Sequence, residues 1–100
     1  MSRKQQVVDL FRSNGEVLDR LGVSRIGLFG SVVREEDTPA SDVDIFVEFT
    51  QEGHTFSNFN RLCEFLENHI GVNFDLVTPQ SLSPYLGPRI LSEVQYVPLT

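Results

Sequence analysis

The chain has 100 residues, of which 40% are hydrophobic and 22% are charged, a composition typical of a single globular domain. Its formal net charge of −6 argues against binding to a nucleic-acid backbone, which attracts clustered lysines and arginines. No apolar stretch approaches the ~20 residues of a membrane span, and the start lacks a signal-peptide pattern. We therefore expect one domain over residues 1–100, located in the cytoplasm, with no membrane attachment and no direct contact with nucleic acid.

The first third of the chain predicts helix followed by strand. Apolar residues recur on one helical stripe between residues 4 and 21, and the segment Ser13-Asn14-Gly15 interrupts that stripe. We expect two short helices or one kinked helix, ended by Gly22. Residues 24–29 then form an apolar run with the length of a buried strand, and a short helical turn is expected directly after it, over 31–34.

A second strand and a second amphipathic helix follow a polar loop. Residues 42–49 alternate between polar or aromatic side chains and aliphatic ones, which predicts a strand. The apolar spacing over residues 59–70 predicts a helix, with Ser57 or Asn58 as its N-cap and Gly71 as its left-handed terminator.

The last quarter predicts a third strand and short helical pieces. Residues 72–77 alternate like the second strand, and Thr78-Pro79 is a typical cap followed by proline at the first helical position. Gly87-Pro88 breaks or restarts that helical region, and residues 94–99 are expected to form a short edge strand. This order of elements predicts an α/β (α+β) domain in which helices pack on one side of a small mixed sheet.

Two aspartates at the start of the second strand are the most informative residues. Asp42 and Asp44 are two residues apart, so a strand would direct both carboxylates to one face. Two such carboxylates repel each other, and a divalent cation such as Mg²⁺ would relieve the repulsion. The pair taken alone fits an Asp-rich turn at a solvated strand end equally well.

A glycine and a serine precede this pair at the exit of the first strand. Gly30 allows backbone to approach a phosphate closely, and Ser31 adds a hydroxyl donor at the start of a turn. A Gly-Ser pair is common in ordinary turns and caps, so its meaning depends on the aspartates. Asp75 on the third strand strengthens the interpretation, because a strand beside the second would bring a third carboxylate to the same place.

The spacing of these residues resembles that of a known family. Gly30-Ser31, ten residues, Asp42-x-Asp44 and a later strand aspartate in Phe74-Asp75-Leu76-Val77 resemble the minimal nucleotidyltransferases of the DNA polymerase β superfamily. Members of this family are the antitoxins of HEPN/MNT toxin–antitoxin pairs. The resemblance implies a nucleotidyltransferase (polymerase β-like) fold and Mg²⁺-dependent transfer of AMP from ATP to a tyrosine of an all-helical HEPN toxin. Two bound Mg²⁺ ions are expected.

The resemblance also implies a role for each matching residue. Gly30 and Ser31 would hold the triphosphate, while Asp42, Asp44 and Asp75 would be the catalytic, metal-binding carboxylates. Arg34 matches an arginine of the family's Gly-Ser-x-Ala-Arg-Gly pattern and would contact phosphate or form a surface ion pair.

Two departures from the family pattern leave a second function open. Val33 stands where the family usually has alanine, and Glu35 stands where it usually has glycine. Both changes are expected to perturb triphosphate binding, and they favour a catalytically impaired antitoxin that neutralises its partner by binding only. A nucleotide-transfer subunit that acts on a small molecule is a third, weaker hypothesis. A neighbouring reading frame that encodes an all-helical protein with an Arg-x-x-x-x-His segment would favour the protein substrate.

Overall fold

Four strands form one mixed sheet in the order β3-β2-β1-β4 in this computed structural model, which describes residues 2–71 and 73–99. Strand β1 (Val23–Phe29) pairs antiparallel with both β2 (Val43–Phe49) and β4 (Gln95–Tyr96), whereas β3 (Phe74–Val77) runs parallel to β2. The small mixed sheet expected from the sequence is confirmed. The two strands with predicted functional residues, β2 and β3, are neighbours.

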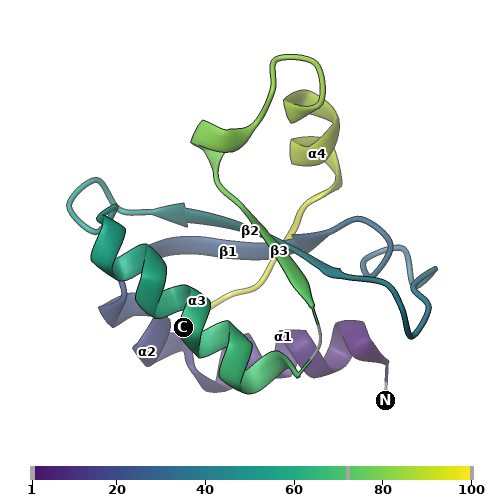
Figure 1. Cartoon of the computed structure of the whole chain (residues 1–100), viewed down its shortest axis with the longest axis horizontal. Helices are drawn as coiled ribbons and strands as arrows, with labels where there is room; N and C mark the ends of the chain where they lie inside the picture. Colours follow the sequence, from purple (N-terminus) through teal and green to yellow (C-terminus); the bar gives the residue numbers. More distant parts are fainter. Residues whose placement is uncertain (1, 72, 100) are drawn as a thin grey trace.

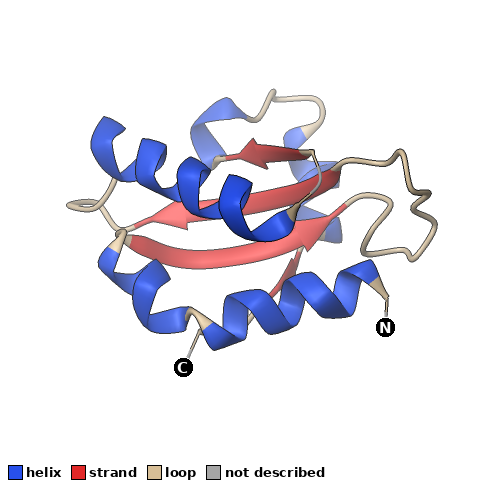
Figure 2. Cartoon of the chain, turned by 60° about the horizontal axis from the view of Figure 1, so that its bottom comes forward, coloured by secondary structure: helices blue, strands red, loops and turns tan. Residues whose placement is uncertain are grey.

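Helices α1, α2 and α3 cover one face of this sheet. Helices α1 (Arg3–Ser13), α2 (Gly15–Arg20) and α3 (Phe56–Ile70) lie below the sheet in Figure 1, as the sequence predicts. Figure 2 shows α3 on one side and α1 and α2 on the other, both running roughly along the strands. The short helix η1 (Pro79–Ser81) and helix α4 (Gly87–Glu93) lie above the sheet in Figure 1, so the upper face is only partly covered.

The alternation of β2 separates the core from the polar face. Val43, Ile45 and Val47 are fully buried and belong to the hydrophobic cluster that also contains residues of α1, α2 and α3. Because successive strand residues point to opposite faces, Asp44 lies on the other, upper face. The fold thus packs the aliphatic side chains of β2 against the helices, while on the upper face Phe46 is buried and Asp44 stays half-buried.

The predicted break in the first helical segment is confirmed. Helix α1 ends at Ser13, and α2 begins at Gly15. The C-cap residue of α1 is Asn14, whose side-chain amide donates to the Leu10 carbonyl over 2.8 Å. This side-chain bond satisfies an end carbonyl of α1 and helps to stop the helix. None of the helices within the described residues has the length and apolar run that crossing a membrane requires.

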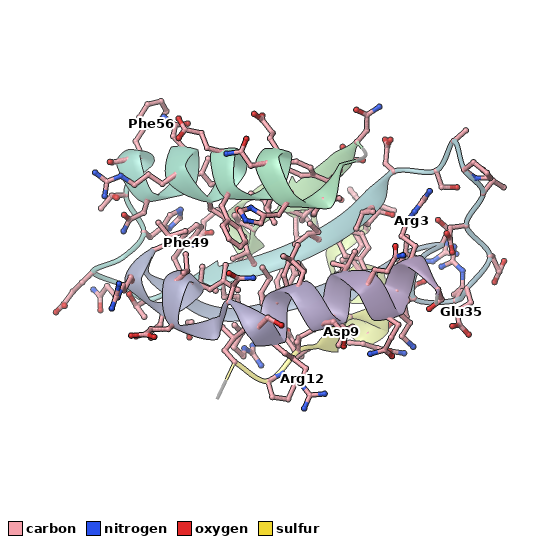
Figure 3. All side chains as sticks on the ribbon, turned by 90° about the horizontal axis from the view of Figure 1, so that it is seen from below. Arg3, Asp9, Arg12, Glu35, Phe49 and Phe56 are labelled. Carbon is pink, nitrogen blue, oxygen red and sulfur yellow. The ribbon has the colours of Figure 1, made fainter. Side chains whose placement is uncertain are left out.

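Helix α3 begins earlier than its apolar spacing predicts. Thr55 is the N-cap, and its hydroxyl accepts a 3.1 Å hydrogen bond from the Asn58 amide, so the predicted cap at Ser57 or Asn58 is wrong. Phe56 hides the boundary because it is apolar yet 83% exposed, and Figure 3 shows it at the start of α3. Gly71 ends the helix in the left-handed conformation, as predicted.

The C-terminal elements are shorter than the sequence suggests. Thr78 precedes η1 with Pro79 at its first position, and α4 restarts the helix at Gly87. The edge strand β4 covers only Gln95 and Tyr96 of the expected 94–99. The predicted start of the third strand at Val72 lies outside the described residues.

Candidate active site

The candidate site lies on a line across three adjacent strands. Phe29 of β1 is the cross-strand partner of Asp44 of β2, and Asp44 is in turn the partner of Asp75 of β3. Neighbouring strands are ~4.8 Å apart, so these three positions are consecutive across the sheet. Gly30 follows Phe29 directly, and Asp42 immediately precedes β2. The structure therefore brings the glycine turn and all three predicted aspartates to one end of β1, β2 and β3.

Repulsion from the neighbouring carboxylates disfavours the charged form of Asp44. Burial raises the pKa of Asp44, and the nearby carboxylates of Asp75 and Asp42 raise it further. The Arg34 guanidinium opposes this effect on the pKa, whereas Glu93 adds to it. Asp42 and Asp75 are exposed, while Asp44 is half-buried. The site thus collects negative charge that a bound cation would neutralise.

The ligands available at this site suit a hard cation. Among the described residues, no three Asp, Glu, His or Cys side chains already converge into a complete metal-binding cluster. Mg²⁺ is usually held by only one or two carboxylates, and substrate phosphates and water complete its shell. The all-oxygen set of Asp42, Asp44 and Asp75 fits that chemistry.

Gly30 lies directly against the carboxylate of Asp44. Its φ of 76° lies in the left-handed region that favours glycine. A Cβ added at this position would lie only 2.2 Å from Oδ2 of Asp44. The absence of a side chain at Gly30 therefore makes room for the Asp44 carboxylate, in addition to permitting the turn. Sequence reasoning found the glycine but not this contact.

The segment after Gly30 forms a single turn and no regular helix. The Arg34 amide donates to the Gly30 carbonyl over 3.3 Å, and the Glu35 amide donates to the Val32 carbonyl over 3.1 Å. Any helix-dipole attraction for phosphate at Ser31 is therefore limited to that of one turn. Ser31 itself is half-buried and follows the glycine at the site.

The two departures from the family pattern have different structural consequences. Val33 is only 9% exposed and packs in the hydrophobic cluster, so its side chain lies on the core side of the turn. Glu35 has a φ of 57°, and it is the only described residue other than glycine with a positive φ. The turn keeps the conformation that favours glycine and imposes it on a glutamate, at a cost in backbone strain.

We predict that Glu35→Gly stabilises the protein. Glycine adopts a positive φ without strain, which stabilises the folded chain. Glycine also has more conformational freedom in the unfolded chain, which offsets part of this gain. The net increase in the free energy of unfolding should be about 0.5–1 kcal/mol. Urea denaturation measures this difference. Glu36→Gly is the control, because Glu36 has no positive φ, and it should destabilise the protein through the freedom of glycine and the loss of its exposed ion pair with Arg34. An equal effect of the two substitutions would refute the assigned strain.

Arg34 connects the turn to α4. Its guanidinium forms an ion pair with Glu36, with 3.3 Å between Nε and Oε1, and a second ion pair with Glu93 at the end of α4. In this structure the arginine is therefore held by carboxylates, and its contact with phosphate stays a prediction. Sequence reasoning did not select Glu93, because nothing in its local pattern shows that it reaches a turn 59 residues earlier.

Arg3 is a second residue that sequence reasoning missed. Its Nη1 donates to the carbonyls of Thr38 and Ser41, over 3.1 and 3.0 Å, and lies 3.7 Å from Oδ2 of Asp37. Figure 3 shows Arg3 at the start of α1, directed toward the loop between β1 and β2. This loop leads into Asp42, so Arg3 ties the approach to the first aspartate to the helical layer.

Comparison with known proteins identifies the family. The profile of the nucleotidyltransferase domain family matches residues 12–97. This chain belongs to that family. The match spans the turn at Gly30 and all three aspartates of the site, so the nucleotidyltransferase domain and the candidate site coincide.

Relatives of this nucleotidyltransferase carry related names. The protein adenylyltransferase MntA of Thermococcus cleftensis is 44% identical over 82 residues, which are 82% of each chain. A candidate protein adenylyltransferase of Methanocaldococcus jannaschii is 36% identical over 97% of this chain and 100% of its own length.

Solved structures confirm the fold. The structure of a candidate minimal nucleotidyltransferase, 32% identical, superposes with a TM-score of 0.79 over 95% of both chains. A chain from a crystal structure of a toxin–antitoxin with AMP-PNP superposes with a TM-score of 0.63 at 22% identity, over 87% of this chain and 74% of that one. The predicted nucleotidyltransferase fold is therefore correct.

Proposed function

We propose that this nucleotidyltransferase transfers AMP from ATP to a hydroxyl of a partner protein, as the antitoxin of a toxin–antitoxin pair. One observation carries the proposal: Gly30, Asp44 and Asp75 lie side by side at one end of three neighbouring strands, with Asp44 packed against Gly30. The names of the relatives support protein as the substrate. A tyrosine of an all-helical HEPN toxin, in the cytoplasm, is the acceptor that the family resemblance favours.

In this proposal, residues at the end of β1 bind the triphosphate, and residues at β2 and β3 bind the metal. Gly30 and Ser31 at the end of β1 hold the triphosphate, because the glycine lets phosphate approach the backbone and the serine donates a hydrogen bond. Arg34 leaves its carboxylate partners to contact the phosphates. Asp42 just before β2, Asp44 of β2 and Asp75 of β3 would hold two Mg²⁺ ions. Bound Mg²⁺ supplies charge neutralisation and polarises the attacking and leaving oxygens.

Asp75 has a further role in proton transfer. It is exposed on β3 and lies on the far side of Asp44 from the glycine turn, where an incoming hydroxyl would arrive. A carboxylate within reach of that hydroxyl accepts its proton as the new bond to phosphorus forms. Neither Tyr85 nor Tyr96 of this chain is proposed as the acceptor.

The double substitution Asp42→Asn with Asp44→Asn tests the proposal. The double variant and the unchanged chain are each co-purified with the protein encoded by the neighbouring reading frame and given α-labelled ATP with Mg²⁺. We expect label on the partner with the unchanged chain and none with the double variant, because its amides bind Mg²⁺ weakly. Circular dichroism establishes that the variant is folded. Label transfer by the folded variant would refute the assigned carboxylates.

Calorimetry with Mg²⁺ and a non-hydrolysable ATP analogue separates catalysis from mere partner binding. An active transferase should bind the nucleotide with a dependence on Asp42 and Asp44. Partner neutralisation without any such nucleotide binding would instead support an antitoxin that acts by binding only.

A further inference from the structure

The order of the strands sets the direction of the proposed reaction. The turn at Gly30 lies at the end of β1, Asp44 lies on β2, and Asp75 lies on β3. In phosphoryl and nucleotidyl transfer the attacking and leaving oxygens are roughly in line on opposite sides of phosphorus. If pyrophosphate leaves on the side of β1, the acceptor enters on the side of β3. Strand β3 is the edge of the sheet, so that side is open.

A cleft opens at this edge, beside the catalytic carboxylates. Its volume is ≈ 690 Å³, and its walls include Asp42 and Asp75 of the site together with Phe74 of β3. The last turns of α3 contribute Cys63 and Glu67. The cleft therefore shares Asp42 and Asp75 with the candidate site and extends from them to the last turns of α3. Its size is that of a typical small-ligand site, enough for one large side chain and part of a neighbour.

The charged side chains that line this cleft are all acidic. None of the described residues that line it is basic, and Asp42, Asp75 and Glu67 supply three carboxylates. Bound Mg²⁺ would neutralise the two aspartates. Glu67 lies outside the metal site, and none of the ion pairs formed among the described residues involves it. Glu67 is thus the negative charge that remains for a ligand.

We propose that this cleft, which we call the β3-edge cleft, is the acceptor subsite, and that Glu67 selects a segment with lysine or arginine beside the reacting hydroxyl. The inference rests on the proposed function. The ring of the acceptor packs on Phe74, and the flanking cation pairs with Glu67. A charge-assisted bond of this kind fixes the acceptor more firmly than apolar contact alone.

The transfer that the subsite serves is balanced in atoms and charge. The acceptor oxygen forms a bond to the α-phosphorus of ATP, and the bond from that phosphorus to its bridging oxygen breaks. Pyrophosphate leaves with the electron pair, on the side of the Gly30 turn. The hydroxyl proton passes to Asp75 and then to solvent.

The first test reverses the charge of Glu67. Initial rates of transfer from ATP are measured against the concentration of the partner protein for Glu67→Lys and for Glu64→Lys. Glu64 is exposed on the same helix but does not line the cleft, so it is matched in charge change and helix context. We expect Glu67→Lys to raise the KM for the partner about 10-fold, as befits the loss of one charge-assisted contact, with an unchanged Kd for the ATP analogue. Equal KM values for the two variants would overturn the proposal.

The second test uses Cys63, the single cysteine of the chain, as a reporter inside the cleft. Its alkylation by iodoacetamide is followed with Arg-Tyr-Arg amide, with Glu-Tyr-Glu amide and with the Mg²⁺-bound ATP analogue. We expect slower alkylation with the basic peptide only, and we expect Glu67→Lys to abolish that protection. Protection by the nucleotide would assign the cleft to the base of ATP and overturn the proposal, as would equal effects of the two peptides.

These outcomes are distinguishable from failure of the proposed function. Label transfer that depends on Asp42 and Asp44 establishes the function without reference to Glu67. Transfer that is present but indifferent to Glu67 rejects the subsite alone. Absence of transfer to any protein rejects the function, whereas the Cys63 experiment still reports what enters the cleft.

Discussion

Asp44→Asn should lower the rate of AMP transfer by about 100- to 1000-fold and at the same time raise the Tm of the metal-free protein. The loss of activity follows from the central position of Asp44, between the glycine turn and Asp75. The gain in stability follows from its environment, because burial and the carboxylates of Asp75 and Asp42 raise the pKa of Asp44 in the folded chain. A neutral amide of the same shape removes that unfavourable charge.

The pH dependence of this gain has a definite sign. The pKa of Asp44 is raised above its ordinary value of 3.8, so around that value the folded chain binds more protons than the unfolded chain. The free energy of unfolding therefore falls as pH rises from about 3.8 through the folded pKa, and this loss is absent from Asp44→Asn. The difference in Tm between the variant and the unchanged chain should grow over this window and then level off.

Thermal unfolding with and without millimolar Mg²⁺ measures both effects. Mg²⁺ should raise the Tm of the unchanged chain more than that of Asp44→Asn, because it binds the folded carboxylates. Asp19→Asn is a suitable control, since it removes the same charge from α2, on the helical side of the sheet. A lower Tm for metal-free Asp44→Asn than for the unchanged chain would contradict the assigned repulsion.

Gly30→Ala should be the most damaging substitution that removes no functional group. The new methyl would lie 2.2 Å from Oδ2 of Asp44, and the φ of 76° would strain any residue with a side chain. The Asp44 carboxylate has to move, and a shift of about 1 Å at a reacting centre can cost roughly 100-fold in rate. We expect a loss of transfer of that size or greater.

Gly71→Ala isolates the backbone contribution to this effect. Gly71 has a φ of 74°, close to that of Gly30, but a Cβ there would meet nothing within 4 Å. Its substitution should cost only the left-handed strain, about 1–2 kcal/mol in the free energy of unfolding. Urea denaturation should show a larger loss for Gly30→Ala. If Gly30→Ala and Gly71→Ala lower the free energy of unfolding equally, the close approach of Gly30 to Asp44 does not contribute to stability.

Glu35 shows how the sequence can depart from a family pattern without changing the turn. Its φ of 57° keeps the conformation that favours glycine, and the buried Val33 anchors the same turn to the core. The side chain of Val33 is buried in the core and therefore lies away from the exposed side of the turn. The transfer assay decides whether the enzyme is impaired.

Much of the site could be predicted from short-range patterns. The alternation of residues 42–49 placed both aspartates opposite the buried aliphatic side chains, and the structure has Val43, Ile45 and Val47 in the core. The interruption at Ser13-Asn14-Gly15 likewise predicted the break between α1 and α2. The α3 cap was missed because the exposed Phe56 has the wrong polarity for a helix end in water.

By itself, the amino-acid sequence determined which residues are candidates for the chemistry and which face of each strand they occupy, because side-chain periodicity is set within a few residues of backbone. The tertiary structure alone decided that β3 pairs parallel to β2 with Asp75 beside Asp44, and that Gly30 packs on the Asp44 carboxylate. It also brought Arg34 to Glu93 and Arg3 to the loop before Asp42. These contacts depend on strand order and register, which are selected by burial of the whole core and are not encoded in any local pattern.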